Sequence, residues 1–181
     1  LSVFLCNSNQ FNGDLPSFNN NISLTNFQCS SNLFSGELPS FSSCTQLVTF
    51  RIGNNQFNGS LPSFSTNTLL QTFNISANLF SSALPSFNNL TNLVTFNCSY
   101  NKFSGNIPSF SGCTSLQNFT AGGTLNAWTG TVPYFPVSLL ILDIDGASSA
   151  LLQFPTDLLS NLINLTGFAC SGVKTSAPNT I

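Results

Sequence analysis

The feature that most constrains the fold of this sequence is an asparagine that recurs every 23 residues. The positions are Asn9, Asn32, Asn55, Asn78 and Asn101, and Asn126 continues the series after two extra residues. The same phrase follows each of the first five, from NQFNGDLPSF to NKFSGNIPSF. A fixed period of this length is typical of a solenoid, in which each repeat buries its apolar face only against its neighbours. The asparagine amide has donors and an acceptor that can tie turns together, so we predict a structural asparagine ladder.

Each repeat opens with the pattern Leu-x-x-Phe-x-(Cys/Ile), as in Leu47, Phe50 and Ile52. The last two apolar positions alternate with polar ones, which is the period of a strand with one buried face. Eight such segments occur between Leu1 and Cys170. The pattern therefore predicts a parallel sheet with one strand from each repeat.

The phrase after the asparagine places Phe, Gly and a Leu-Pro or Ile-Pro step at fixed offsets. Glycine suits a turn with positive φ, and Ser82 is the one departure in the regular repeats. Proline forces the residue before it into an extended conformation. Stacked aromatic columns account for the 19 phenylalanines and predict a phenylalanine-rich core.

The combined pattern, L-x-x-F-x-C-x-x-N-x-F-x-G-x-(L/I)-P, resembles the plant-type leucine-rich repeat. The resemblance implies a leucine-rich-repeat solenoid, a right-handed superhelix of about eight coils with its parallel β-sheet on the concave face. It also implies short helical or irregular turns on the convex face. Because the convex segment here reads PSF-S-x-(C/N) instead of carrying leucines, we expect irregular turns.

The repeats form one domain spanning residues 1–181, with regular repeats over 1–119 and irregular repeats over 120–181. The insertion AGGTLNAW disturbs the register after Phe119. Further on, Leu158, Leu162 and Leu165 indicate one short helical turn. The chain begins directly on a predicted strand, so we expect that an upstream segment has been cleaved or omitted.

Charge is scarce: charged residues make up 4% of the sequence, and the net charge is −2. Three scattered cations exclude an electrostatic nucleic-acid footprint, and no apolar run is long enough to span a membrane. A surface of Asn, Ser, Thr and Gln, together with the family resemblance, predicts an extracellular or cell-surface location.

The six cysteines are read as small apolar residues, because four of them replace isoleucine at the inward strand position. These four are Cys6, Cys29, Cys98 and Cys170, while Cys44 and Cys113 share a column on the convex side. We expect free thiols, with a Cys6–Cys29 bridge left open as an alternative.

Candidate N-glycosylation acceptors follow the N-x-(S/T) pattern, at a frequency close to that expected by chance for this composition. They are Asn21, Asn58, Asn74, Asn89, Asn97, Asn118 and Asn164.

Catalysis is not expected. The sequence has no histidine, which removes the usual triads and most metal clusters. The one carboxylate pair of interest, Asp143 and Asp145, has no third carboxylate nearby in the sequence. We therefore predict no catalytic, cofactor-binding or metal-binding residues, and no cofactor.

The outward positions of the predicted concave sheet carry nearly the same small polar set in every repeat. The candidate face comprises Thr49, Thr72, Thr95, Asn74, Asn97, Asp143 and Asp145. A face that specifically binds one folded protein should vary along its length and include aromatic or arginine side chains as anchors. A uniform face binds a periodic partner, binds a glycan-like partner weakly, or binds nothing.

Three functions follow as hypotheses. The first is a structural module whose end coils stack head to tail into a fibre, because solenoid ends without polar caps expose core residues. The candidate ends are Leu1, Phe4, Phe11, Phe168 and Cys170. The second is the recognition ectodomain of a receptor-like or inhibitor-like protein, and the third is ice binding by the Thr49, Thr72 and Thr95 ladder. The expected partners are the chain itself, another extracellular protein or a glycan, with no nucleic acid and no membrane insertion.

Overall fold

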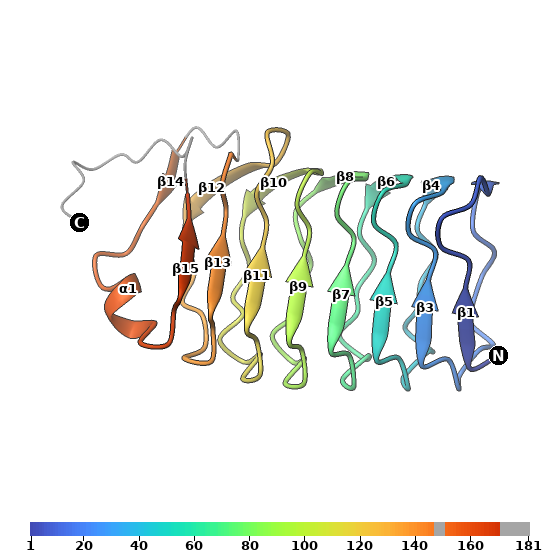
Figure 1. Cartoon of the computed structure of the whole chain (residues 1–181), viewed down its shortest axis with the longest axis horizontal. Coiled ribbons are helices and arrows are strands. Elements are labelled where there is room, and N and C mark those ends of the chain that lie inside the picture. Colours follow the sequence, from blue (N-terminus) through green and yellow to red (C-terminus); the bar gives the residue numbers. More distant parts are fainter. Residues whose placement is uncertain (147–150, 171–181) are drawn as a thin grey trace.

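The fold is a parallel-sheet solenoid, seen in a computed structural model that describes residues 1–146 and 151–170 (Figure 1). Its first sheet has the eight strands in the order β1-β3-β5-β7-β9-β11-β13-β15. Their bounds are Val3–Leu5, Asn26–Gln28, Thr49–Arg51, Thr72–Asn74, Thr95–Asn97, Asn118–Thr120, Ile141–Asp143 and Gly167–Ala169. Every neighbouring pair is parallel, and equivalent repeat positions lie side by side, as Phe50 and Phe73 do. The predicted solenoid and its strand positions are confirmed.

A second parallel sheet, which the sequence did not predict, follows the asparagine ladder, with seven strands in the order β14-β12-β10-β8-β6-β4-β2. In chain order from β2 to β14 the strands are Asn12–Gly13, Leu33–Glu37, Gln56–Ser60, Leu79–Ser82, Lys102–Asn106, Ala127–Thr131 and Leu151–Gln153. Every segment except β14 contains a Gly or Ser with positive φ that reads as a turn former, such as Gly59 at φ 73°. The stacking of coils supplies hydrogen-bonding neighbours that local propensity does not anticipate.

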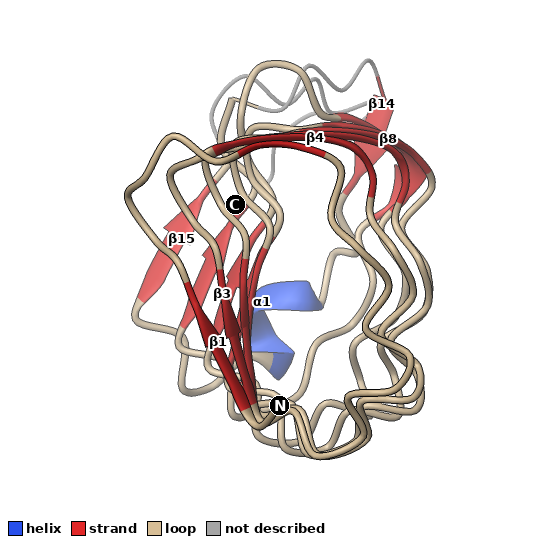
Figure 2. Cartoon of the chain, turned by 90° about the vertical axis from the view of Figure 1, so that its right-hand side faces the viewer, coloured by secondary structure: helices blue, strands red, loops and turns tan. Residues whose placement is uncertain are grey.

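The core lies between the two sheets and the loops that close each coil (Figure 2). Phe50, Phe73 and Phe96 are fully buried and stack along the solenoid axis with ring centroids 5.5 and 5.4 Å apart. A second column packs its edges on the first, as Phe64 does on Phe73 at 4.8 Å. The aromatic columns therefore form one continuous core, as predicted.

The irregular repeats keep the same interior. Trp128 takes the place of a phenylalanine, stacks on Phe103 at 5.8 Å and donates its indole N–H to Ala121 O at 2.8 Å. The one helix of the described residues is α1 (Leu158–Asn161), where the leucine spacing predicted a helical turn. The convex segments of the regular repeats contain no helix. No helix in the described part of the chain has the length and apolar character needed to cross a membrane.

The cysteines are free thiols, and the alternative Cys6–Cys29 bridge is not formed. Cys29, Cys44, Cys98 and Cys113 are buried, which suits small apolar residues. The Cys113 thiol donates a hydrogen bond to Phe87 O at 3.2 Å, and Asn67 in the same repeat position donates to Phe41 O at 3.1 Å. This column therefore links adjacent coils in the loops that precede the first-sheet strands.

Ser82 stands at φ 70° in the column where the adjacent coils have Gly59 and Gly105. A residue with a Cβ atom is strained in this region, so Ser82→Gly should raise the free energy of unfolding by about 1 kcal/mol. The matched control is Gly105→Ser, since an added Cβ at Gly105 would meet nothing closer than 3.8 Å. It should lower stability by a similar amount, measured by chemical denaturation. Equal stabilities for Ser82→Gly and the parent chain would contradict this account.

Candidate binding face

The asparagine ladder holds the turns that link the two sheets. Asn78 donates from its amide nitrogen to Ile52 O at 3.0 Å in the preceding coil and to Ile75 O at 3.2 Å in its own. Its amide oxygen accepts the backbone N–H of Phe57 at 3.0 Å. Asn32, Asn55, Asn101 and Asn126 make equivalent bonds to the preceding coil. The carboxyl ends of the first-sheet strands are therefore fixed relative to one another.

The outer face of the first sheet carries in-register polar side chains. Thr49 pairs with Thr72 and Thr72 with Thr95, and Asn74 pairs with Asn97. Strands in such a sheet lie about 4.8 Å apart. The hydroxyl groups of the three threonines make no hydrogen bond within the described residues. This face therefore presents a row of free hydroxyl groups on a rigid backbone.

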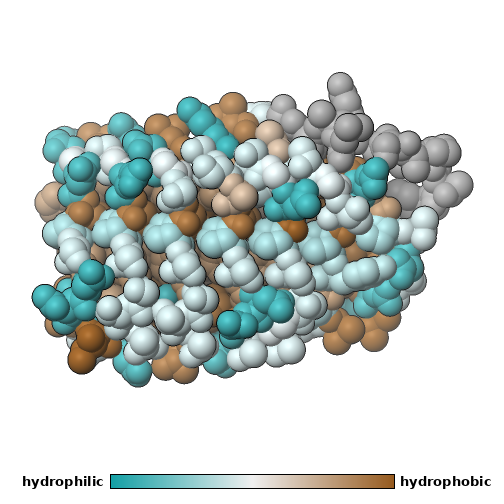
Figure 3. Space-filling view, turned by 180° about the vertical axis from the view of Figure 1, so that it is seen from behind, coloured by the Kyte–Doolittle hydropathy of each residue, from teal (hydrophilic) through white to brown (hydrophobic). Residues whose placement is uncertain are grey.

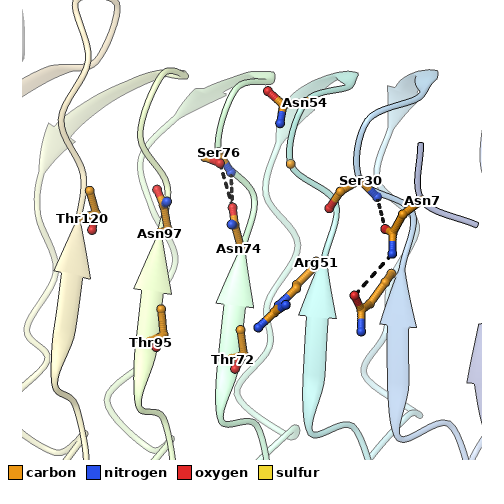
Figure 4. Close-up of a pocket in the computed structure, with 12 residues that line it drawn as sticks. Asn7, Ser30, Arg51, Asn54, Thr72, Asn74, Ser76, Thr95, Asn97 and Thr120 are labelled. Carbon is orange, nitrogen blue, oxygen red and sulfur yellow. Dashed lines mark hydrogen bonds between the residues drawn. The ribbon is translucent and has the colours of Figure 1, made fainter. Parts of the chain in front are cut away.

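The middle of the same face is hollowed, and Figure 4 shows the side chains that surround the hollow. Its volume is about 400 Å³. The lining residues are Asn7, Gln28, Ser30, Arg51, Gly53, Asn54, Thr72, Asn74, Ser76, Thr95, Asn97 and Thr120. All of them are small polar residues or glycine, except for Gln28 and Arg51. The hollow crosses five strands, from β3 to β11, and reaches Asn7 just after β1, which gives it the shape of an extended groove.

Local hydrogen bonds fix the orientation of the amide side chains in this hollow. Asn74 Oδ1 accepts the backbone N–H of Ser76 at 3.0 Å and its hydroxyl at 2.8 Å, and Asn97 Oδ1 accepts the N–H of Ser99 at 3.0 Å. The amide nitrogens of Asn74 and Asn97 make no hydrogen bond within the described residues. Each side chain is thus held by its oxygen and leaves two N–H donors for a ligand.

Arg51 is the only charged residue that lines the hollow. Its side chain is exposed and extends from β5 over the sheet toward Thr72 of β7 (Figure 4). The guanidinium group has no ion pair or hydrogen bond in the described part of the chain. Arg51 was not among the residues predicted for the binding face, although it stands in the outward column between Gln28 and Asn74.

The other residues of the predicted face lie outside the hollow. Asp143 ends β13, and its carboxylate accepts the backbone N–H of Asp145 at 2.9 Å. Neither aspartate lines the hollow, and Thr49 lies next to it but is not one of its lining residues. The structure therefore joins Thr72, Thr95, Asn74 and Asn97 in one site and leaves the aspartate pair at its margin.

The structure supplies few groups for acid–base or nucleophilic chemistry. Within the described residues, no cluster of three or more His, Cys, Asp or Glu side chains could hold a metal ion. Burial raises the pKa of the Cys98 thiol far above its usual range and that of Cys113 to about 11, so both stay protonated near neutral pH. A hydrogen bond from Tyr134 lowers the pKa of Asp157, far from the hollow along the chain.

The predicted assembly ends differ in exposure. Leu1 and Phe11 are 62% and 51% exposed, whereas Phe4 is half-buried and stacks on Phe27 at 4.8 Å. Phe168 and Cys170 are half-buried, and Phe168 packs against Phe154 at 6.0 Å. The residues after Cys170 lie outside the described part of the chain.

The sequon asparagines fall in two groups. Asn58, Asn89 and Asn164 are exposed, while Asn74, Asn97 and Asn118 are half-buried on strands of the first sheet, and Asn21 is half-buried in a turn. The Asn164 amide donates to Val137 O at 2.8 Å, which leaves Asn58 and Asn89 as the most accessible acceptors.

The side opposite the first sheet is also regular, and Figure 3 shows polar rows that repeat from coil to coil. Its segments carry a Pro-Ser-Phe sequence with the exposed serines Ser17, Ser40, Ser63, Ser86 and Ser109. Several of these hydroxyls are used locally, as in Ser40 Oγ to Ser42 Oγ at 3.0 Å. Several serine hydroxyl groups on this side are therefore bonded within the chain, whereas the threonine hydroxyl groups of the first sheet are free.

Neither a protein-family model nor a curated protein matches the sequence. Solved structures do match. The Arabidopsis receptor kinase HAESA, in complex with the peptide hormone IDA and the co-receptor SERK1, is 24% identical with a TM-score of 0.82, over 96% of this chain and 30% of that one. A plant ice-binding protein is 19% identical with a TM-score of 0.73, over 97% and 58%. The ectodomain of the Arabidopsis thaliana receptor kinase SOBIR1 is 24% identical with a TM-score of 0.61, over 84% and 71%.

These structural similarities show a shared fold. The chain spans less than two thirds of the HAESA and ice-binding chains, so it corresponds to a part of each.

Proposed function

From its plant-type leucine-rich-repeat fold, we propose that this chain is a non-catalytic recognition module of an extracellular protein, with the first sheet as its binding face. The observation that carries the proposal is the hollow over five strands, where free hydroxyl and amide groups converge on a rigid sheet. Binding sites are concave surfaces with a few fixed polar groups of this kind. Because the asparagine ladder fixes the strand ends, a ligand meets groups that are already in place, which lowers the entropic cost of binding.

An extended polar ligand fits this face best. The hollow runs across the strands and has no aromatic or aliphatic side chain among its lining residues. Protein interfaces are usually centred on aromatic side chains that fill pockets in the partner. The lining of the hollow offers no apolar pocket for such a side chain. The receptor kinase HAESA, which has this fold, is in complex with a peptide hormone in its structure.

A paired substitution tests the location of the binding face. Thr72→Trp places a bulky side chain in the hollow, and Ser104→Trp places the same side chain on the exposed face of the second sheet. Neither parent side chain makes a hydrogen bond within the described residues, so both variants should fold. On an array of neutral and acidic polysaccharides, we expect Thr72→Trp to lose at least about tenfold in affinity, as when a ligand is displaced from its pocket. Loss with Ser104→Trp alone, or no binding by the parent chain, would contradict the proposal.

Ice binding is the second candidate, and the threonine row is the observation that favours it. Thr49, Thr72 and Thr95 repeat at strand spacing with free hydroxyls, and one structure of similar fold is a plant ice-binding protein. The row is only three threonines long, because Asn26 and Asn118 occupy the flanking positions, and the charged Arg51 stands in the adjacent column, which places the candidate second. In an ice-recrystallisation assay, inhibition that Thr72→Trp abolishes and Ser104→Trp preserves would promote ice binding over ligand recognition.

Head-to-tail self-association stays a prediction. Of the predicted end residues in the first coil, Leu1 and Phe11 are 62% and 51% exposed. Burial of each would contribute about 1.5–3 kcal/mol to an end-to-end contact. Sedimentation of the purified chain as a monomer at high concentration would contradict this prediction.

A further inference from the structure

We propose that the hollow of the first sheet binds a polyuronate, a hydroxyl-rich chain whose carboxylate pairs with Arg51. The inference rests on the proposed function, since it assigns a ligand class to the same face. It starts from the one cation that the hollow contains.

Arg51 has the properties of an anion anchor. The guanidinium is exposed, has no ion pair in the described part of the chain, and is joined by no carboxylate among the lining residues. Its planar fork donates two parallel hydrogen bonds to a carboxylate, which Lys cannot do. A neutral ligand that covered the hollow would strip water from this cation and offer no compensating charge. An acidic ligand is therefore favoured over a neutral one.

The remaining lining groups favour hydroxyl groups as the rest of the ligand. Thr72 and Thr95 offer free hydroxyls, and Asn74 and Asn97 offer free N–H donors on the same two strands, β7 and β9. These groups recur from strand to strand, at about 4.8 Å, and so suit a ligand that also repeats. Sugar rings supply hydroxyl donors and acceptors at each repeat, whereas an acidic peptide brings apolar side chains that have no pocket here. The combination of one cation and repeated small polar groups points to an acidic polysaccharide.

The test compares oligogalacturonate with its fully methyl-esterified form, which has the same sugar chain without the carboxylates. Calorimetry should show binding of the oligogalacturonate to the 181-residue chain and none of the ester. Arg51→Gln should weaken that binding by about tenfold or more, as expected for a lost charge-assisted pair, and added salt should weaken binding to the parent chain. The matched control is Lys102→Gln, because Lys102 is an exposed cation on β10 of the second sheet. Its affinity should equal that of the parent chain.

Three results would overturn the inference. Equal affinities for the acid and the ester would exclude the carboxylate as the recognised group, and a loss shared by Arg51→Gln and Lys102→Gln would show a non-specific charge effect. No binding of oligogalacturonate would exclude a polyuronate as the ligand of the hollow. If binding of another ligand is still lost in Thr72→Trp and kept in Ser104→Trp, the face retains its proposed role and only the ligand class fails.

Discussion

Replacing Phe73 with alanine is expected to lower the free energy of unfolding by about 3–5 kcal/mol, because it opens a large cavity in the core. Phe73 is fully buried and has four ring neighbours at centroid distances of 4.8–5.5 Å, which are Phe50, Phe64, Phe87 and Phe96. Each coil of a solenoid packs only on its neighbours, so the cavity weakens the coupling between both halves of the chain. Urea denaturation followed by circular dichroism measures the loss.

Phe11→Ala is the matched control for this cavity. Phe11 is 51% exposed, and its one ring contact is Phe34 at 6.1 Å. Its removal should cost less than about 1 kcal/mol, as for a partly exposed side chain. Similar losses for Phe73→Ala and Phe11→Ala would contradict the assignment of the aromatic columns to a tightly packed core.

The second large effect is expected for Asn78→Ala, which should cost about 3 kcal/mol. The substitution removes the acceptor of the Phe57 N–H and the donor to carbonyl groups of two coils. Asn78 is only 4% exposed, so water cannot readily replace these bonds, and buried unpaired groups cost about 1–3 kcal/mol each.

Asn9→Ala is the control that distinguishes the loss of hydrogen bonds between coils from the loss of an asparagine side chain as such. Asn9 is exposed, and its amide nitrogen donates only to Cys6 O and Asn7 O within its own coil. We expect a cost below about 1 kcal/mol, since water can take over these bonds. A cost for Asn78→Ala as small as that for Asn9→Ala would show that the ladder contributes little to stability.

The repeat made the first sheet predictable. Strict recurrence of Leu, Phe and Cys or Ile gives a strand with one buried face, and the fixed period puts equivalent residues such as Phe50 and Phe73 side by side. The second sheet was not predictable in the same way, since Gly59 and Ser82 read as turn residues. Their strands form because the stacked coils bring hydrogen-bonding partners together, and this is a property of the assembled solenoid.

The candidate site was predicted only in part. The period places Thr72, Thr95, Asn74 and Asn97 on one face, and the structure adds that they border one hollow. Asp143 lies in the same outward column as Thr120, and its carboxylate accepts the Asp145 N–H as Asn74 accepts that of Ser76, but the hollow ends at Thr120. Arg51 was overlooked because its importance depends on the absence of a nearby carboxylate around the hollow, which a sequence pattern does not show.

Backbone chemical-shift mapping of this chain during titration with oligogalacturonate would locate the bound ligand. We expect shifts confined to the first-sheet residues around the hollow, such as Gln28, Arg51, Thr72, Asn74 and Asn97. We expect unchanged signals for Asn58 and Ser104 on the second sheet and for Ser63 on the opposite side. Shifts centred on the second sheet or on the Pro-Ser-Phe segments, with the first sheet unchanged, would contradict the claim that the first sheet is the binding face.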